Sequence, residues 1–262
     1  MFGKNKILKP EIHEGKNLKV QEIFATFQGE GPFVGYPSVF VRLGGCNLAC
    51  DFCDTEFDSF KEFSLEEILQ RIEELSVQNL SEKDLFVRQE LKKMNIVLPQ
   101  EIENWFEQKR KRNLVVITGG EPFRQPIERF CEELVKRKFL VQIETNGTLF
   151  REIPREVKII CSPKNPQKNS PKVVNHSKSY HKIRGDLLAR IDALKFIISA
   201  SNLGYQDIAE VGQSEYNIPV YLQPMDEYDE EKNRINAKLV LNLAKKHGAH
   251  ISWQIHKMLE IS

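Results

Sequence analysis

Three cysteines are the residues of this sequence whose type and spacing point most directly to chemistry. Cys46, Cys50 and Cys53 are separated by three and two residues, within one short stretch of chain. Thiolates are the ligands that iron–sulfur clusters prefer, and a short loop lets all three sulfur atoms face one cubane. Because a cubane has four irons, three cysteines leave one iron open to a small molecule. The spacing therefore predicts a 4Fe–4S cluster that binds a ligand directly.

Other roles for the five cysteines fit the sequence less well. A structural zinc site needs four ligands, and the nearest histidines to the three cysteines are His13 and His176. Ordinary ferredoxins use four cysteines, whereas a catalytic zinc with three cysteines and a water remains an alternative. Cys131 shares a predicted helical face with apolar residues and Cys161 ends a predicted strand, so neither is expected to bind metal.

A second candidate ligand site follows the cysteines along the chain. Residues 118–122 read Thr-Gly-Gly-Glu-Pro and end a predicted strand. Glycines let the backbone approach a ligand closely. A Gly-Gly pair alone is more often an ordinary turn. The motif indicates a ligand site because it follows a predicted strand and lies downstream of the cysteines.

The composition limits which classes of function are open. The chain has 38 Lys and Arg against 37 Asp and Glu, and its formal charge of +1 speaks against a broad nucleic-acid-binding face. Basic residues gather at residues 109–112 and 164–182, where solvated surface is the simplest interpretation. No secretory signal is visible, and no apolar run approaches the ~20 residues of a membrane span. We therefore expect a cytoplasmic protein in a reducing compartment.

The elements that must position these residues alternate between strands and helices. A helix is predicted to begin after Ser64, where Ser64 and Glu67 form a capping box and apolar residues follow at helical spacing. Further helices are predicted over residues 125–137 and 230–246. The predicted strands cover residues 20–27, 38–43, 114–117, 139–143, 157–160, 193–198, 219–222 and 250–253.

This alternation predicts an α/β fold with a parallel sheet and helices outside it. The units are too few for a complete eight-fold barrel, so we expect a partial, open β/α barrel with its active site at the carboxyl ends of the strands. We predict a single domain over residues 1–262, with insertions near residues 76–113 and 164–184. The first insertion is charged and amphipathic, which indicates one or two extra helices, and the second is a polar, lysine-rich loop.

The cysteine motif resembles the signature of radical S-adenosylmethionine (SAM) enzymes, which also has an aromatic residue, here Phe52, before the third cysteine. In that superfamily the amino and carboxylate groups of SAM chelate the open iron. An electron from the cluster then cleaves SAM to a 5′-deoxyadenosyl radical, which removes a hydrogen from the substrate. Residues 118–122 stand where the superfamily holds the amino group of SAM, and the resemblance implies the open barrel of the radical SAM type.

Further motifs make the sequence similar to the 7-carboxy-7-deazaguanine synthase family of queuosine and deazapurine biosynthesis. They cover nearly the whole chain in family order, although both insertions are longer than the compact family form. The motifs are FQGEG at residues 27–31, VRLGGC at 41–46, CDT at 53–55, ETNGT at 144–148, SPK at 162–164, QPM at 223–225 and QIHK at 254–257.

The family resemblance implies a specific reaction. It predicts a lyase that converts 6-carboxy-5,6,7,8-tetrahydropterin to 7-carboxy-7-deazaguanine with loss of ammonia. The implied cofactors are the 4Fe–4S cluster, SAM that is regenerated in each cycle, and Mg²⁺. A homodimer and an electron donor of the flavodoxin or ferredoxin type are also implied.

The resemblance also implies a role for each motif. Cys46, Cys50 and Cys53 would hold the cluster and Thr55 the Mg²⁺, since a hydroxyl oxygen suits this hard cation. No catalytic residue is expected beyond these ligands, and His256 lies in a family motif without an assigned role. The expected substrate ligands are Gln28, Glu30, Arg42, Thr118, Ser162 and Lys164, and the expected SAM ligands are Gly119, Gly120, Glu121, Glu144, Asn146 and Gln223.

Ordinary structural interpretations stand beside these roles. Gln28 and Glu30 fit a turn at a strand end, and Arg42 fits a surface ion pair. Thr55 can cap a turn, and residues 144–147 can be a strand that runs into an Asn-Gly turn.

Two other functions compete with this family. A glycyl-radical-enzyme activase shares the cysteine spacing, but its substrate is a protein and does not need carboxylate-binding residues such as Arg42. A zinc or iron–sulfur module that carries electrons leaves residues 118–121 and 144–147 without a purpose. Metal content and SAM cleavage distinguish the three functions.

Overall fold

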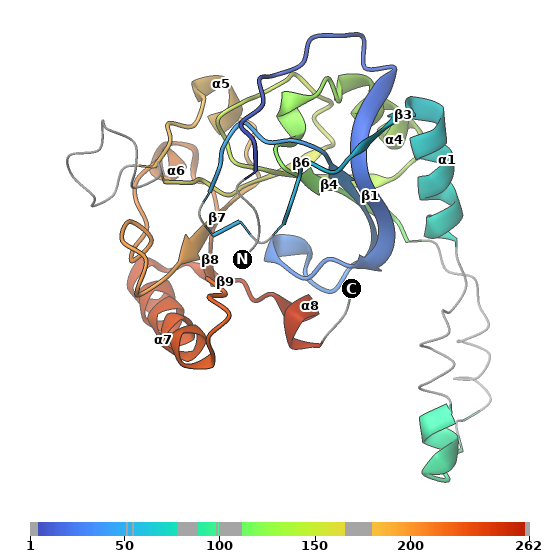
Figure 1. Ribbon diagram of the computed structural model, residues 1–262. Coiled ribbons are helices and arrows are strands. Elements are labelled where there is room, and N and C mark those ends of the chain that lie inside the picture. The colour runs from blue at the N-terminus through green and yellow to red at the C-terminus, as the bar shows by residue number, and fades with distance from the viewer. Residues whose placement is uncertain are drawn as a thin grey trace.

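The protein is described here by a computed structural model, which covers residues 5–50, 52–53, 55–77, 89–97, 99, 112–165 and 180–259. These residues form a nine-stranded sheet in the order β3-β1-β2-β4-β5-β6-β7-β8-β9 (Figure 1). β1 pairs antiparallel with β2 and β3, and all neighbours from β2 to β9 are parallel. The strands are β1 (Asn17–Phe27), β2 (Pro37–Leu43), β3 (Lys61–Ser64), β4 (Leu114–Gly119), β5 (Leu140–Thr145), β6 (Lys158–Cys161), β7 (Ala193–Ile198), β8 (Val220–Pro224) and β9 (His250–Ile251).

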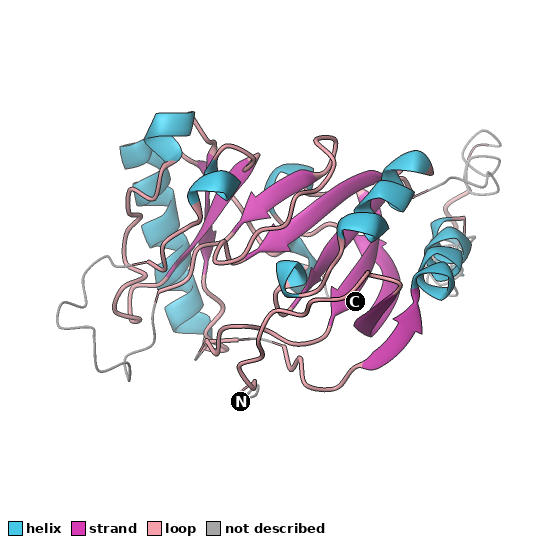
Figure 2. Ribbon diagram, turned by 90° about the horizontal axis from the view of Figure 1, so that it is seen from above, coloured by secondary structure: helices cyan, strands magenta, loops and turns pink. Residues whose placement is uncertain are grey.

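Helices surround the outside of this open, fanned sheet (Figure 2). The predicted capping box starts α1: the Ser64 hydroxyl accepts from the Glu67 amide at 3.3 Å, and the Ser64 amide donates to the Glu67 carboxylate at 2.8 Å. The helices are α1 (Leu65–Ser76), α4 (Glu128–Lys136), α5 (Gly185–Leu188), α6 (Gln213–Tyr216), α7 (Glu230–His247) and α8 (Ile255–Met258), with 3-10 turns η1 (Gly31–Phe33) and η2 (Pro122–Arg124).

Alternating side chains give the sheet an apolar face and a polar face. On β7, Leu194, Phe196 and Ile198 are buried in the main apolar core, whereas Lys195 and Ile197 line a cavity on the opposite face. Because successive side chains of a strand point to opposite faces, this arrangement follows directly from the sequence of the strand. The helices therefore cover one face, and the other is left for a binding site.

The predicted fold class is confirmed, since the structure is an α/β fold with an open and mostly parallel sheet. All eight predicted strands occur with shifts of a few residues at their ends. The helix predicted from residue 125 begins only at Glu128, because Gln125 precedes a proline and stays extended, with φ −99° and ψ 154°. β3 and the short helices α5, α6 and α8 were not predicted, because each has only four residues and none of these segments stands out as a periodic or apolar run.

Most of the two predicted insertions falls outside the described residues. The ends of the first insertion meet, because the Arg112 amide donates to the Ser76 carbonyl at 2.8 Å and the Arg112 guanidinium donates to the Leu75 carbonyl at 3.0 Å. The extra helices expected there lie mainly on undescribed residues, and the single domain stays a prediction. Among the described helices, none has both the length and the apolar character needed to cross a membrane.

Candidate active site

A cavity of about 480 Å³ lies at the carboxyl ends of the parallel strands, as the fold predicts. It is lined by every residue that the sequence nominated for the site, with the exception of Glu121. Cys131 and Cys161, which were not expected to bind metal, lie instead in the apolar core. Residues from both ends of the chain, more than 200 positions apart, thus face one space.

The cysteine loop presents sulfur atoms that accept hydrogen bonds. The Leu48 amide donates to Cys46 Sγ at 3.4 Å, and Asn5 Nδ2 donates to Cys53 Sγ at 3.4 Å. Burial raises the pKa of the Cys46 thiol to about 12, so its thiolate needs a bound cation. Hydrogen bonds to sulfur are typical of iron–sulfur ligands, and the donor set therefore fits a cluster.

A cubane does not require its three cysteines to meet at one point, since each binds a different iron. The described residues contain no group of three His, Cys, Asp or Glu side chains arranged around a single metal ion. Asp54, which belongs to the CDT motif, is outside the described residues.

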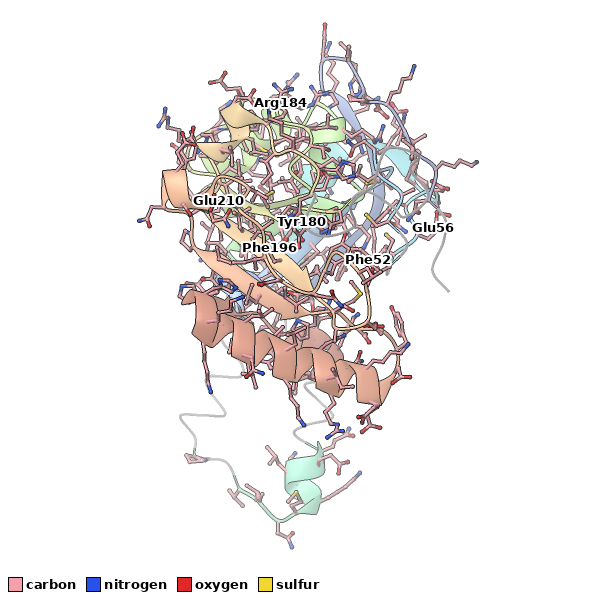
Figure 3. All side chains as sticks on the ribbon, turned by 90° about the vertical axis from the view of Figure 1, so that its left-hand side faces the viewer. Phe52, Glu56, Tyr180, Arg184, Phe196 and Glu210 are labelled. Carbon is pink, nitrogen blue, oxygen red and sulfur yellow. The ribbon has the colours of Figure 1, made fainter. Side chains whose placement is uncertain are left out.

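The cysteine loop is fixed by the ends of neighbouring strands. Asn47 Nδ2 donates to the Thr148 hydroxyl at 2.7 Å, and Asn146 Nδ2 donates to Asn47 Oδ1 at 3.0 Å. The Phe52 ring meets the Tyr205 ring edge-on, with centroids 5.0 Å apart. Tyr205 in turn contacts Tyr180, so an aromatic chain leads from the loop into the fold (Figure 3). The aromatic residue of the motif thus anchors the loop.

The last residue of β4, Gly119, and the next residue, Gly120, allow the strand to pass close behind the cysteine loop. A Cβ atom at Gly119, which has φ +120°, would lie 2.1 Å from the Leu43 carbonyl oxygen. A Cβ atom at Gly120 would lie 2.1 Å from the Gly45 carbonyl oxygen. These positions exclude any side chain, and the backbone of both residues lines the cavity.

Glu121 lies behind the site rather than in it. Its fully buried carboxylate accepts from the Thr145 hydroxyl at 2.8 Å, the Asn146 amide at 2.7 Å and the Phe123 amide at 3.1 Å. Burial raises the pKa of this carboxyl to about 7, although the three hydrogen bonds oppose the shift. The side chain therefore holds the turn after β5, and direct contact with a ligand in the cavity does not follow from the structure.

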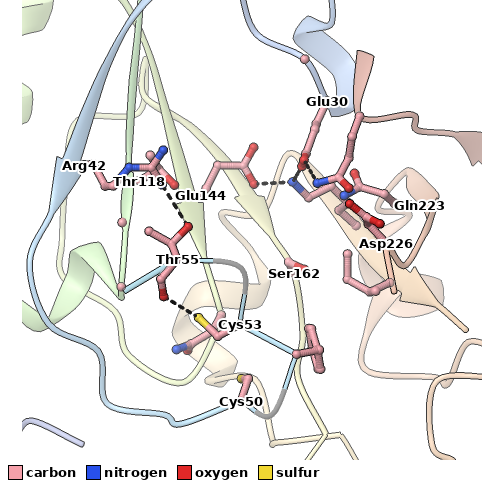
Figure 4. Close-up of a pocket in the computed structure, with 18 of the residues that line it drawn as sticks. Glu30, Arg42, Cys50, Cys53, Thr55, Thr118, Glu144, Ser162, Gln223 and Asp226 are labelled. Atoms are coloured by element: carbon pink, nitrogen blue, oxygen red, sulfur yellow. Dashed lines mark hydrogen bonds and ion pairs between the residues drawn. The ribbon is translucent and has the colours of Figure 1, made fainter. Parts of the chain in front are cut away.

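Two carboxylates, whose side chains are only 16% and 15% exposed, share one lysine in the wall of the cavity. Lys195 Nζ donates to Glu30 Oε2 at 2.5 Å and to Glu144 Oε2 at 2.9 Å (Figure 4). Burial alone would raise the pKa of Glu30, but Lys195 outweighs it and holds that pKa at about 2. Sequence reasoning missed Lys195, and the available signal was a lone lysine inside the apolar strand β7.

A cationic corner, formed by Arg42 together with Thr55 and Thr118, lies next to the cysteine loop (Figure 4). Arg42 is the strand partner of Thr118, and its Nη1 donates to the Thr55 hydroxyl at 3.4 Å. Its Nε also lies 3.5 Å from the carboxylate of Glu22, a half-exposed side chain. The surface ion pair considered from the sequence is therefore present, yet Arg42 lines the cavity as well.

Other nominated residues contribute polar groups to the walls. Gln28 accepts the Glu30 amide at 3.1 Å, while its buried Nε2 has no partner among the described residues. Lys164 Nζ donates to the Ser162 hydroxyl at 2.5 Å, and burial lowers the pKa of this lysine. Gln223 Oε1 accepts from the Ser252 hydroxyl at 3.0 Å. An orphaned donor and a buried cation both favour a polar, anionic ligand.

Several lining residues carried no expectation of a role. His256 packs on Gly29, since a Cβ atom there would lie 2.1 Å from His256 Nδ1. Lys257 pairs with Asp226 at 2.9 Å. Asn5 Nδ2 donates to the Thr55 carbonyl at 2.9 Å, which orders the end of the cysteine loop. The QIHK motif was the available signal for His256 and Lys257, whereas Asn5 lies outside every motif of the sequence.

Comparison with known proteins gives the family. No family model matches the chain. The 7-carboxy-7-deazaguanine synthase of Rickettsia prowazekii is 46% identical over 261 residues, which cover 100% of this chain and 96% of that protein. The synthase of Rhodospirillum rubrum is 32% identical over 285 residues, with 100% of both chains covered. The crystal structure of QueE from Escherichia coli shares the fold, with a TM-score of 0.58 at 20% identity over 90% of this chain and 93% of that one. The chain belongs to the 7-carboxy-7-deazaguanine synthase family.

Proposed function

We propose that the protein is a radical SAM lyase that converts 6-carboxy-5,6,7,8-tetrahydropterin to 7-carboxy-7-deazaguanine with loss of ammonia. Membership of the family supports the product. The single observation that carries the proposal is the cavity itself, which brings three cysteines, a cationic corner and a carboxylate pair to one space. A homodimer, a flavodoxin- or ferredoxin-type electron donor and a cytoplasmic location remain predictions.

Cys46, Cys50 and Cys53 would hold the 4Fe–4S cluster, because all three residues line the cavity and the sulfur atoms of Cys46 and Cys53 accept hydrogen bonds. When bound, the cluster supplies the electron that turns SAM into a radical able to remove a substrate hydrogen.

The chain offers SAM both backbone and side-chain contacts. The backbone of Gly119 and Gly120 lines the cavity next to the cysteine loop, where it would hold the amino acid part of SAM. Glu144 suits ribose hydroxyls, because its carboxylate accepts hydrogen bonds, and Asn146 and Gln223 would seat the nucleoside. Glu121 would act on this subsite indirectly, through its hydrogen bond to the Asn146 amide at 2.7 Å.

The carboxylate of a carboxypterin matches the positively charged and hydroxyl side chains of the cavity. Arg42 would bind the substrate carboxylate in its planar fork, and the Thr55 hydroxyl would place Mg²⁺ beside it. Thr118, as the strand neighbour of Arg42, extends this subsite. Ser162 and Lys164 would add a second positive charge to the substrate side of the cavity.

The amino edge of the pterin requires an acceptor, and its ring carbonyl requires a donor. Glu30 provides the acceptor, because Lys195 keeps it ionised. The unpartnered Nε2 of Gln28 provides the donor, since Gln28 stands two residues before Glu30. A buried donor without a partner costs free energy, so its presence indicates a ligand that satisfies it.

The test is an anaerobic reaction with the reconstituted full chain, dithionite, SAM, Mg²⁺ and 6-carboxy-5,6,7,8-tetrahydropterin. We expect 7-carboxy-7-deazaguanine by mass spectrometry, and we expect Cys50→Ala to abolish it. Cys131→Ala serves as the matched control, because Cys131 is buried in the core away from the cavity. This control should retain iron and activity.

Each negative result has a distinct meaning. Cleavage of SAM without deazaguanine contradicts the substrate and leaves the radical SAM class, including an activase, in place. Bound zinc instead of iron contradicts the cluster itself. Iron without SAM cleavage would favour an electron-transfer module.

A further inference from the structure

Lys195 is the centre of a hydrogen-bonded chain that crosses the cavity wall. Its Nζ lies 2.5 Å from Glu30 Oε2 and 2.9 Å from Glu144 Oε2. Each carboxylate holds one further amide: Gln254 Nε2 donates to Glu30 Oε1 at 2.7 Å, and Gln142 Nε2 donates to Glu144 Oε1 at 2.6 Å. Each carboxylate thus accepts hydrogen bonds at both of its oxygen atoms, and Lys195 is the donor that the two carboxylates share.

Three separate elements meet at this lysine. Glu30 follows β1, Glu144 lies on β5 and Lys195 lies on β7, where only 5% of the residue is exposed. A buried ion pair contributes little net stability compared with apolar side chains of similar size. The stability of β7 therefore does not explain the lysine, whereas a requirement for two oriented carboxylates does.

We propose that Lys195 is a positioning residue shared by two ligands, holding Glu30 toward the pterin substrate and Glu144 toward SAM. This inference rests on the proposed function, which assigns the two carboxylates to different ligands. The ammonium fixes one oxygen of each carboxylate, so each retains lone pairs for a ligand in a set direction. Loss of the lysine would release both carboxylates together.

The other charges around the pair determine what its loss would do. Glu30 faces Lys195 and His256, whereas Glu144 faces Lys195, Glu30 and Lys164. Without Lys195, two carboxylates that are largely withdrawn from water repel each other, and a proton replaces the lysine as the pH falls. A protonated Glu30 accepts hydrogen bonds poorly, so pterin affinity would become dependent on pH.

The experiment measures binding rather than turnover. Anaerobic calorimetry of the cluster-reconstituted full chain gives the affinities for SAM and for 6-carboxypterin, an oxidised and unreactive pterin, between about pH 6 and pH 8. The variants are Lys195→Met, Lys195→Arg and, as the control, Lys158→Met. Lys158 is also a strand lysine in an ion pair, 2.9 Å from Asp192, but it does not line the cavity.

We expect Lys195→Met to lower the affinity for both ligands by about tenfold or more, because each carboxylate loses the hydrogen bond from Lys195. The loss of pterin affinity should grow as the pH falls, whereas the wild type and Lys158→Met should show no such trend. Lys195→Arg keeps the charge and should restore part of both affinities.

Three results would overturn the inference. These are unchanged affinities in Lys195→Met, a loss for only one ligand, and an equal loss of pterin affinity at every pH. If Lys195→Met does not fold, the same substitution is made in Glu144→Gln and compared with Glu144→Gln alone, since this background retains one carboxylate. If the double variant binds 6-carboxypterin as tightly as Glu144→Gln alone, the inference is overturned there too. A wild type that does not bind 6-carboxypterin contradicts the proposed function instead.

Discussion

Glu30 and Glu121 are both carboxylates withdrawn from water, but their pKa values shift in opposite directions from the ordinary value. Burial raises both values, yet Glu30 also faces the ammonium of Lys195 and ends at about 2. Glu121 is met by one hydroxyl and two amides, which are neutral donors, and ends at about 7. At Glu30 the charged partner outweighs burial, whereas the neutral partners of Glu121 do not. At Glu144, which shares Lys195 with Glu30, burial still outweighs the lysine and the pKa is raised. The two residues therefore serve different purposes, with Glu30 ionised at any ordinary pH and Glu121 able to titrate near neutrality.

Glu121 should make the stability of the protein depend on pH. Its folded pKa of about 7 lies above the ordinary value of 4.5, so the folded state keeps a proton that the unfolded state has lost between these values. The free energy of unfolding should therefore fall as the pH rises through this window, by up to about 3 kcal/mol. Urea unfolding of the wild type and of Glu121→Gln measures the difference.

Glu121→Gln should remove this pH dependence and also lower stability by about 1–3 kcal/mol below pH 5, because an amide cannot accept at both oxygen positions. Glu132→Gln, at an exposed position of α4, is the control and should leave stability nearly unchanged. Equal slopes of unfolding free energy against pH in the wild type and in Glu121→Gln would contradict the assignment.

Thr55 offers a test of the proposed Mg²⁺ site that leaves the cysteine loop in place. Thr55→Val removes the hydroxyl but keeps the backbone carbonyl, which accepts from Asn5 at 2.9 Å. We expect normal iron content and a rise of about tenfold in the Mg²⁺ concentration needed for half-maximal activity. Thr55→Ser keeps the oxygen and should behave as the wild type. The Mg²⁺ role is wrong if Thr55→Val responds to Mg²⁺ as the wild type does.

At the scale of elements, the sequence predicts what local patterns encode. The capping box at Ser64 marks the start of α1, and apolar runs mark the strands. The alternation of strands and helices predicts the parallel pairing from β2 to β9, but not the antiparallel pairing of β1 with β2 and β3. In contrast, the pairing of Lys195 with Glu30 joins residues 165 positions apart, and no local pattern records it. Glu121 was assigned to the ligand because of its motif, although its three hydrogen bonds hold the next strand end.

The close passage of β4 behind the cysteine loop gives a prediction for Gly120. In Gly120→Ala the new Cβ would stand 2.1 Å from the carbonyl oxygen of Gly45, which directly precedes Cys46. The backbone has to shift, at a cost of about 1–3 kcal/mol, and the shift displaces a cluster ligand. We expect less iron after reconstitution and weaker SAM binding, measured by iron analysis and calorimetry.

Gly185→Ala is the matched control for this glycine. Gly185 has no atom within 4 Å of an added Cβ, so its variant should bind iron and SAM as the wild type does. Full iron content and unchanged SAM affinity in Gly120→Ala would show that the cysteine loop does not depend on this contact.

At the scale of the whole molecule, both predicted insertions leave the fold and return to it at adjacent points. The Arg112 amide donates to the Ser76 carbonyl, and the His181 amide donates to the Lys164 carbonyl, each at 2.8 Å. Only the second of these junctions touches the cavity, because Lys164 lines it. The two insertions should therefore differ in their importance for the site.

Replacement of residues 78–111 by a short Gly-Ser linker should leave the active site intact. The hydrogen bond between Arg112 and Ser76 already holds the two ends together, and loop-closure entropy changes slowly with length, by about 0.6 kcal/mol for each doubling. We expect unchanged iron content, SAM affinity and 6-carboxypterin affinity, measured anaerobically. The same linker in place of residues 166–179 should weaken ligand binding, because it changes the restraint on Lys164. Loss of the cluster in the first deletion would show that this insertion is needed for the fold. Normal ligand binding in the second deletion would show that the contacts of Lys164 with Ser162 are enough to hold the lysine in place.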